Sequence, residues 1–141
     1  RCLPGRQVVN RLLLDTHIVI WLATAPERVP NDIQQLVSEA EQRYVSVVSF
    51  VEVALKHRKD PALFPFDLDL LLQAMSELQA LELPLRSDHT AHVARLPMRH
   101  RDPFDHLLMA QAIEEQLPLV TMDADIAAYA EDGLTVIGKM R

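Results

Sequence analysis

The sequence predicts an α/β protein with three α/β/α layers around a central, mostly parallel sheet. Short apolar segments of strand length alternate with longer segments whose apolar residues recur at helical spacing. Acidic residues follow several of the apolar segments, where the carboxyl ends of parallel strands form ligand sites. At 141 residues, the chain is long enough for one domain with a sizeable core.

Five segments have the composition of strands. The first is a purely apolar run that ends at Asp15, and the second is rich in β-branched and aromatic residues. Pro84 within the third argues for a short strand or an edge position. The predicted strands are Leu12–Leu14, Tyr44–Val48, Leu83–Leu85, Leu119–Thr121 and Leu134–Ile137.

Helices are predicted between these strands. Asp15 or Thr16 can cap the first helix, and Asp102-Pro103 is a strong start because proline is favoured at the first helical position. The basic segment Pro97–Arg101 is predicted as a loop. The predicted helices run from Asp15 to Leu22, Asn31 to Gln42, Ser49 to Arg58, Leu68 to Leu81, Ser87 to Leu96, Pro103 to Gln116 and Asp123 to Glu131.

Composition excludes several classes of protein. A net charge of -6 argues against non-specific coating of nucleic acid or anionic membrane, although a local basic cleft could still bind RNA. The single cysteine, Cys2, rules out an internal disulfide framework and favours the reducing cytoplasm. Residues 1–10 read as a leader or trimmed extension before a domain over 11–141. Asp15 and His17 interrupt the apolar stretch that a signal peptide would need.

Four acids stand at or near predicted helix starts: Asp15, Glu52, Asp105 and Asp123. Two charges about 5 Å apart repel by roughly 3 kcal/mol at an effective dielectric of about 20. No lysine or arginine stands beside Asp15, Glu52 or Asp123 in the sequence. If the four acids converge, a divalent cation is the natural counter-charge, and oxygen ligands favour Mg²⁺ or Mn²⁺ over zinc.

Each acid taken alone has a simpler interpretation as a helix cap. Ser49 and Glu52 match the capping-box pattern, and Asp15, Asp102 or Asp123 could each cap a helix. Asp105 would then be a favourable first-turn charge. The metal interpretation rests on the four acids together.

The motifs around these acids resemble the PIN-domain ribonucleases and, more narrowly, the VapC-type toxins of bacterial toxin–antitoxin modules. The resemblance runs from about Leu12 to Val136. It rests on Leu13-Leu14-Asp15-Thr16-His17, Ser46-Val47-Val48-Ser49 leading to Glu52, His100-Arg101-Asp102-Pro103-Phe104-Asp105 with Leu108, Ala110, Gln111 and Ala112, and Val120-Thr121-Met122-Asp123. Related sequences often place Trp just before the Glu, where this chain has Val51.

The resemblance implies a PIN-like fold and a Mg²⁺- or Mn²⁺-dependent endoribonuclease. Asp15, Glu52, Asp105 and Asp123 would be its catalytic and metal-site acids, with Thr121 and Asp102 in supporting positions. A metal-activated water would hydrolyse the RNA phosphodiester to a 5′-phosphate and a 3′-hydroxyl. A cognate antitoxin protein would bind the toxin and block its cleft.

Two other functions compete with this interpretation. A degenerate PIN module would bind RNA or a protein without catalysis, although such modules usually lose one or more acids. A phosphoaspartyl enzyme could use Asp15 as its acceptor, but haloacid-dehalogenase-like proteins carry a second Asp where this chain has His17.

Further side chains are weaker candidates. Arg99 and Arg101 could grip RNA phosphates, and His106 could reach the cleft or lie on a helix surface. His89 and His92 have a spacing that can bind zinc, yet no obvious third ligand is near. Trp21, Phe50 and Phe104 read as core or interface residues, and the few aromatic residues offer no obvious stacking platform for single strands.

Surplus apolar residues on two predicted helices favour assembly. The helices Asn31–Gln42 and Asp67–Leu81 carry more of them than one buried face each requires. The surplus in the second helix comprises Leu68, Leu70, Leu71, Leu72, Met75 and Leu78. We expect one such surface to form a homodimer and another to bind the antitoxin.

Overall fold

A computed structural model describes residues 10–99 and 102–138. Five strands form one sheet in the order β3-β2-β1-β4-β5, and all four neighbouring pairs are parallel. The strands are β1 (Arg11–Leu14), β2 (Gln42–Ser46), β3 (Leu81–Leu83), β4 (Leu119–Thr121) and β5 (Val136–Gly138). The predicted α/β fold with a parallel sheet is confirmed, and the predicted segment 1–10 lies almost wholly outside the described residues.

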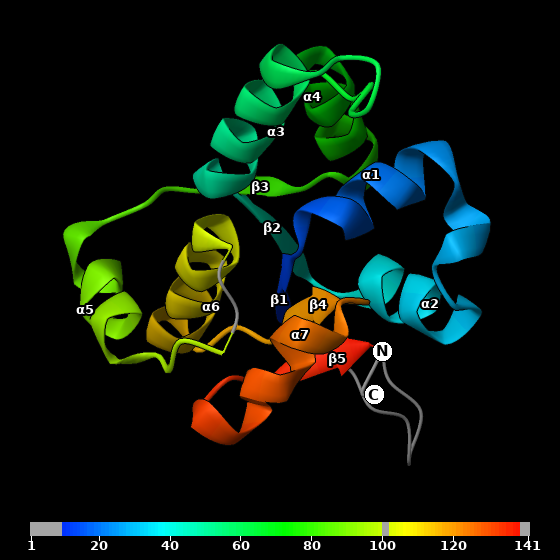
Figure 1. The fold of residues 1–141 in the computed structure, drawn as a ribbon. Helices are drawn as coiled ribbons and strands as arrows, with labels where there is room; N and C mark the ends of the chain where they lie inside the picture. The colour runs from blue at the N-terminus through cyan, green and yellow to red at the C-terminus, as the bar shows by residue number, and fades with distance from the viewer. Residues whose placement is uncertain (1–9, 100–101, 139–141) are drawn as a thin grey trace, which may run out of the picture.

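Helices cover both faces of the sheet. Figure 1 shows α1 and α2 on one side of β1 and β2, with α5 and α6 on the other side. The helices are α1 (Thr16–Thr24), α2 (Asn31–Glu39), α3 (Val47–Lys59), α4 (Leu68–Leu78), α5 (Ser87–Arg95), α6 (Pro103–Glu115) and α7 (Ala124–Ala127), with 3₁₀ turns η1 (Pro26–Arg28) and η2 (Ala128–Asp132). Among the described residues, none of the helices combines the length and the apolar character needed to cross a membrane.

The alternation of side chains along β1 divides the core into two layers. Leu12 and Leu14 pack into a cluster with residues of α1, α2 and α4, whereas Leu13 packs into a second cluster with residues of α6. All three leucines are fully buried, and burial of each stabilises the fold by about 1.5–3 kcal/mol. The central strand is therefore fixed from both faces, and so is the position of Asp15 directly after it.

The second strand ends earlier than its composition predicts. Val47 and Val48 belong to α3 rather than to β2, because the Ser46 side chain caps the helix and accepts from the Val48 amide at 2.9 Å. Here a local cap overrides the β propensity of the valines. The predicted capping box of Ser49 and Glu52 is therefore wrong, since both residues lie inside α3.

The third strand is also displaced from its predicted position. Helix α4 ends at Leu78 because Gln79 adopts a left-handed conformation and its amide bonds back to the carbonyl of Met75. The strand occupies Leu81–Leu83, so the prediction of 83–85 is wrong. The predicted edge position is confirmed, and Pro84 stands just beyond the strand.

The last predicted helix and strand are both corrected. The predicted helix from Asp123 to Glu131 is a four-residue α7 followed by the 3₁₀ turn η2. Strand β5 begins at Val136, later than predicted, and ends at Gly138, which pairs with Thr121 of β4. The backbone of Gly138 has a positive φ of +131°. A side chain at Gly138 would overlap the carbonyl oxygen of Thr121, so glycine allows the close approach that holds the end of β4.

The order of the strands makes β1 the point where the chain connections diverge. From β1 the chain proceeds to β2 on one side, and β4 later adds to the other side. Ligand sites of open α/β sheets form beyond the carboxyl ends of the strands at such a point. Asp15 at the end of β1 and Asp123 just beyond β4 stand at this crevice.

Candidate active site

Asp15 is a buried carboxylate whose side chain does not serve as a cap. It occupies the N-cap position of α1, but within the described residues its side chain makes no capping hydrogen bond. Its Oδ2 instead accepts a hydrogen bond from Thr121 Oγ1 at 2.7 Å, and the residue is 6% exposed. The capping interpretation therefore fails for Asp15.

Glu52 approaches from α3 and is held by hydroxyl groups. Thr16 Oγ1 donates to Glu52 Oε1 at 2.8 Å, and Ser49 Oγ lies 2.7 Å from Thr16 Oγ1. Because Thr16 has a single hydroxyl proton and gives it to Glu52, Ser49 must donate to Thr16. The resulting chain of hydrogen bonds ties the start of α1 to a glutamate that is 2% exposed.

Lys56 is the residue of this site that the sequence interpretation missed. Its Nζ lies 2.6 Å from Glu52 Oε2, one helical turn along α3. Burial lowers the pKa of Lys56, but the hydrogen bond and charge of Glu52, together with the charges of Asp102 and Asp105, raise it overall. No lysine or arginine stands immediately beside Glu52 in the sequence; the i, i+4 spacing on one helix is the signal that reveals Lys56.

Thr121 links the acids at the ends of β1 and β4. Its Oγ1 donates to Asp15 and accepts from the Asp123 amide at 3.0 Å. Asp123 Oδ1 in turn accepts from the Asp125 amide at 2.8 Å, so Asp123 caps α7. The capping interpretation holds for Asp123, yet the same residue also lines a pocket with Asp15.

The two acids at the start of α6 differ in their contacts. Asp102 caps the helix, with Oδ1 accepting from the Phe104 amide at 2.9 Å, as predicted from the following proline. Asp105 lies in the first turn and is 7% exposed. Both are close enough to Lys56 for their charges to raise its pKa, which places them on the side of the site occupied by Glu52.

An open pocket of about 230 Å³ gives access to Asp15. Its lining comprises Asp15, His17, Trp21, Met122 and Asp123. Burial raises the pKa of Asp15 from 3.8 to about 6; Glu52 adds to the rise, while Thr121 and His17 oppose it. A carboxylate that is costly to ionise and open to a pocket is the kind of group found at functional sites.

The donor set suits a hard divalent cation. Over residues 10–99 and 102–138, no three histidine, cysteine or acidic side chains form a ready metal-binding group. Two carboxylates, Asp15 and Asp123, line the pocket, and Glu52 acts electrostatically on Asp15. Magnesium typically takes one or two carboxylates and keeps several waters, so this set fits it. The four-acid metal site stays a prediction.

Comparison with known proteins identifies the family. The family model of the PIN domain matches residues 12–132. The chain belongs to the PIN-domain family. This PIN domain is 27% identical over 127 residues to "Ribonuclease VapC22" of Mycobacterium tuberculosis, covering 86% of this chain and 93% of that protein.

Solved structures share the fold of this PIN domain. A structure of VapBC-1 from nontypeable Haemophilus influenzae aligns with a TM-score of 0.65 and 16% identity, covering 91% of this chain and 97% of that one. VapBC-5 from Mycobacterium tuberculosis aligns with a TM-score of 0.56 and 22% identity, covering 91% and 98%. The second is described as a member of the VapBC family of toxin–antitoxin systems, and at these identities the likeness of both structures shows the fold.

The basic loop of the PIN domain is anchored by a buried tyrosine. Tyr129 Oη donates to the Pro97 carbonyl at 2.7 Å and accepts from the Arg99 amide at 3.0 Å. The Arg99 guanidinium pairs with Asp132 and lies 5.4 Å from the centre of the Tyr129 ring. Arg101 lies outside the described residues. An RNA contact by Arg99 stays a prediction, and making it would require competition with Asp132.

Three described histidines outside the pocket, His89, His92 and His106, have interior or inter-helical contacts. His106 is 6% exposed and packs against Tyr129 at a ring distance of 6.0 Å, so it is not on the helix surface. His89 Nδ1 accepts from the Arg86 amide, and His89 Nε2 lies 2.9 Å from Glu115. Both nitrogens of His89 are engaged, which explains its role as an α5–α6 contact and leaves it no nitrogen for zinc. His92 makes a similar contact with Glu114.

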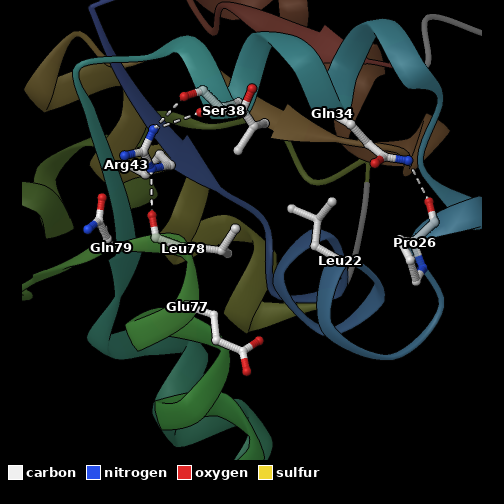
Figure 2. Close-up of a pocket in the computed structure, with 9 residues that line it drawn as sticks. Leu22, Pro26, Gln34, Ser38, Arg43, Glu77, Leu78 and Gln79 are labelled. Carbon is white, nitrogen blue, oxygen red and sulfur yellow. Dashed lines mark hydrogen bonds between the residues drawn. The ribbon is translucent and has the colours of Figure 1, made fainter.

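A second pocket, of about 350 Å³, lies between α1, α2 and α4, and none of the four candidate metal-site acids lines it (Figure 2). Figure 2 shows Arg43 of β2 reaching toward Ser38 and Leu78. The Arg43 guanidinium donates to the carbonyls of Leu78 at 2.8 Å, Val37 at 2.9 Å and Ala40 at 2.8 Å. These carbonyls belong to the ends of α2 and α4, so Arg43 acts as a shared C-terminal cap.

Proposed function

We propose that the chain is a metal-dependent endoribonuclease and the toxin of a type II toxin–antitoxin system. The observation that carries the proposal is Asp15, a buried carboxylate that caps nothing, opens to a pocket and has a pKa raised to about 6. Membership of the PIN-domain family and the resemblance to a protein named as a ribonuclease support this reading.

Asp15, Glu52, Asp105 and Asp123 would hold a Mg²⁺ or Mn²⁺ ion, partly through water because magnesium keeps several of its waters. When bound, the cation would polarise the attacking water and offset the charge that develops on the phosphate. The bond from phosphorus to O3′ would break, leaving a 5′-phosphate and a 3′-hydroxyl.

The residues of the site would orient the acids and move a proton. Thr121 fixes one oxygen of Asp15, and Thr16 fixes one oxygen of Glu52. The carboxylate of Asp15 opens to the pocket, where it would orient the attacking water and accept its proton. Lys56 supplies a positive charge beside Glu52 that could meet an RNA phosphate.

The partner proteins follow from the same family resemblance. Related solved structures include a toxin–antitoxin complex from Klebsiella pneumoniae and a member of the VapBC family of toxin–antitoxin systems, which supports a cognate antitoxin that blocks this cleft. Of the two helices predicted to carry surplus apolar residues, α4 exposes Leu68 and Leu72 but buries Leu71 and Met75. In α2, Ile33 and Val37 are buried, whereas α3, for which no surplus was predicted, exposes Val51 and Leu55. We propose that such surfaces serve the homodimer and the antitoxin, in the cytoplasm; light scattering at high concentration would test the dimer.

RNA cleavage by the purified chain tests the proposed function. Wild type is expected to cleave single-stranded RNA with Mg²⁺ or Mn²⁺ and not with EDTA, and Asp15→Asn is expected to be inactive. Glu115→Gln is the matched control, because it neutralises a partly buried acid at the α5–α6 contact. Equal activity of wild type and Asp15→Asn would reject the proposal in favour of a binding module.

A further inference from the structure

A series of ring side chains leads away from the pocket that contains Asp15. The Trp21 and His17 rings are 5.6 Å apart, and Phe64 stands edge-on to His17 at 6.5 Å. Phe66 then stands edge-on to Phe64 at 5.1 Å. These four residues, here called the aromatic row, combine α1 with the loop that precedes α4.

Two members of the aromatic row, His17 and Trp21, form one wall of the pocket, and the acids lie beside them. His17 and Trp21 line the pocket together with Asp15, Asp123 and Met122. All four rings of the row are partly exposed. The pocket therefore offers two ring surfaces, tilted by 51° to each other, next to the carboxylates at which a phosphodiester would be cleaved.

Two cations flank the aromatic row. The Arg28 guanidinium lies 4.4 Å from the centre of the Trp21 ring, and Lys56 Nζ lies 6.0 Å from the centre of the Phe64 ring. Arg28 thus covers one face of the indole through a cation–π contact, so a ring that stacks here would use the other face of Trp21 or the His17 ring. A ligand with an aromatic ring and a negative charge would find complementary groups on this wall.

We propose that this pocket binds one unpaired nucleobase of the RNA strand, stacked on Trp21 or His17. The inference rests on the proposed function and adds how the substrate is held. A pocket of about 230 Å³ is below the roughly 300–1,000 Å³ typical of drug-sized ligands, which suits a single base. Single-stranded bases stack on aromatic and histidine side chains, whereas a base in a duplex is not available for such stacking.

Stacking on this wall also gives the site a substrate preference. Every base has a π-face, so binding tolerates different sequences but requires an unpaired base. The pocket selects single-stranded RNA over duplex RNA of the same sequence. Trp21 also packs on the core, and this contact keeps the wall rigid.

Trp21 is the only tryptophan in the chain, so its fluorescence reports on the pocket. The full chain in EDTA is titrated with a five-nucleotide single-stranded RNA, with the same strand carrying abasic sites, and with the corresponding duplex. Saturable quenching by the normal strand, but not by the abasic strand or the duplex, is expected. Equal quenching by the normal and abasic strands, or no quenching at all, overturns the proposal.

Substitution of Trp21 separates base binding from catalysis. Trp21→Leu is expected to raise KM for single-stranded RNA about tenfold or more, with kcat changed less than threefold. Trp21→Phe is expected to restore KM, because phenylalanine keeps a stacking face. The control is Tyr44→Leu, which removes an aromatic ring from β2, where Tyr44 donates to Gln42. A Trp21→Leu enzyme with unchanged KM contradicts the proposal.

The outcomes distinguish the subsite from the proposed function. RNA cleavage without quenching of Trp21 rejects the subsite and retains the nuclease. Base-dependent quenching without cleavage by any preparation rejects the nuclease and retains the subsite. Quenching by an isolated antitoxin but by no oligonucleotide makes the wall a protein contact and rejects the subsite. If Trp21→Leu fails to fold, the fluorescence titration of wild type still shows whether the pocket binds an unpaired base.

Discussion

In two polar clusters of this molecule, the pKa of an acid is shifted in opposite directions: that of the partly buried Glu115 is lowered and that of the buried Asp15 is raised. At the α5–α6 contact, Glu115 accepts from Arg86 at 2.7 Å and contacts His89 at 2.9 Å, and these contacts lower its pKa despite burial. At the carboxyl ends of β1 and β4, burial raises the pKa of Asp15. Both clusters are built by neighbouring elements, but in the described part of the chain Glu115 contacts an arginine and a histidine directly, whereas Lys56 in the second cluster pairs with Glu52 rather than with Asp15. We infer that Glu115, whose charge is balanced by Arg86 and His89, stabilises the fold, whereas Asp15, whose charge is not balanced by a direct ion pair in the described residues, is available to bind a ligand.

The largest expected effect comes from Asp15→Asn. We expect cleavage to fall by about 10²–10³-fold or more, because the carboxylate acts on the reacting groups. The folded-state pKa of about 6 exceeds 3.8, so the contribution of Asp15 to stability is most favourable below pH 3.8 and declines as pH rises to 6. At pH 7 the metal-free variant should therefore be more stable than wild type, by up to about 3 kcal/mol. Urea unfolding at pH 4 and pH 7 measures the difference; a variant that is less stable at pH 7 would contradict the account.

The next effect concerns Thr121, which orients Asp15 without touching the substrate. Thr121→Val removes the hydrogen bond that lowers the pKa of Asp15 and should reduce cleavage about 10- to 100-fold. The acidic limb of the pH–rate profile should move to higher pH, since a higher pKa delays ionisation of Asp15. An unchanged profile with a reduced rate would mean that Thr121 serves only the fold.

Removing the charge of Glu115 at the α5–α6 contact should have the opposite effect to Asp15→Asn: stability falls while cleavage is kept. Glu115→Gln should destabilise the fold by about 1–3 kcal/mol near pH 7 and leave cleavage within twofold of wild type. Because the folded-state pKa of Glu115 is lowered, its stabilising contribution is present above the unfolded pKa and is lost as pH falls through the folded value. The gap between the two proteins should therefore close in acid. A gap that persists at low pH would argue against the charge as its source.

The smallest effect on stability is expected for Lys56, which pairs with Glu52 in the cluster that contains Asp15. Lys56→Met removes a cation from Glu52, but the lysine side chain is 36% exposed and Thr16 still donates to the glutamate. The metal-free protein should lose about 1 kcal/mol. Added Mn²⁺ should stabilise Lys56→Met more than wild type, because no ammonium competes for Glu52. If Mn²⁺ shifted the melting temperatures of wild type and Lys56→Met equally, Lys56 and the metal would not compete for Glu52.

The sequence predicts an element well where the signal is local and poorly where a distant contact decides it. The run Leu12–Leu14 and the pair Asp102-Pro103 carry strong local signals, so the central strand and the start of α6 were placed correctly. The start of α3 was misplaced because Val47 and Val48 favour strand locally, while the Ser46 cap, linked to buried Gln111, starts the helix. Such a contact spans 65 residues of sequence, and single-residue propensities carry no information about it.

Prediction of the site had a similar limit. The acids could be named because of their positions after strands and at helix starts. The sequence did not show which acids serve as caps, since Asp15 and Asp123 occupy equivalent N-cap positions and only Asp123 uses its side chain there. The aromatic row was missed because its rings come from two separate segments and meet only in the fold.

The central claim is that the acids at this end of the sheet are gathered for a cation. The most direct test is the melting temperature of wild type, Asp105→Asn and Glu115→Gln with and without Mn²⁺ or Mg²⁺. Metal is expected to raise the melting temperature of wild type and Glu115→Gln, with scarcely any change for Asp105→Asn. Metal-free Asp105→Asn is also expected to be at least as stable as wild type. Equal metal shifts in all three proteins, with Asp105→Asn destabilised by about 0.3–1 kcal/mol, would reduce Asp105 to a first-turn helix charge and contradict the claim.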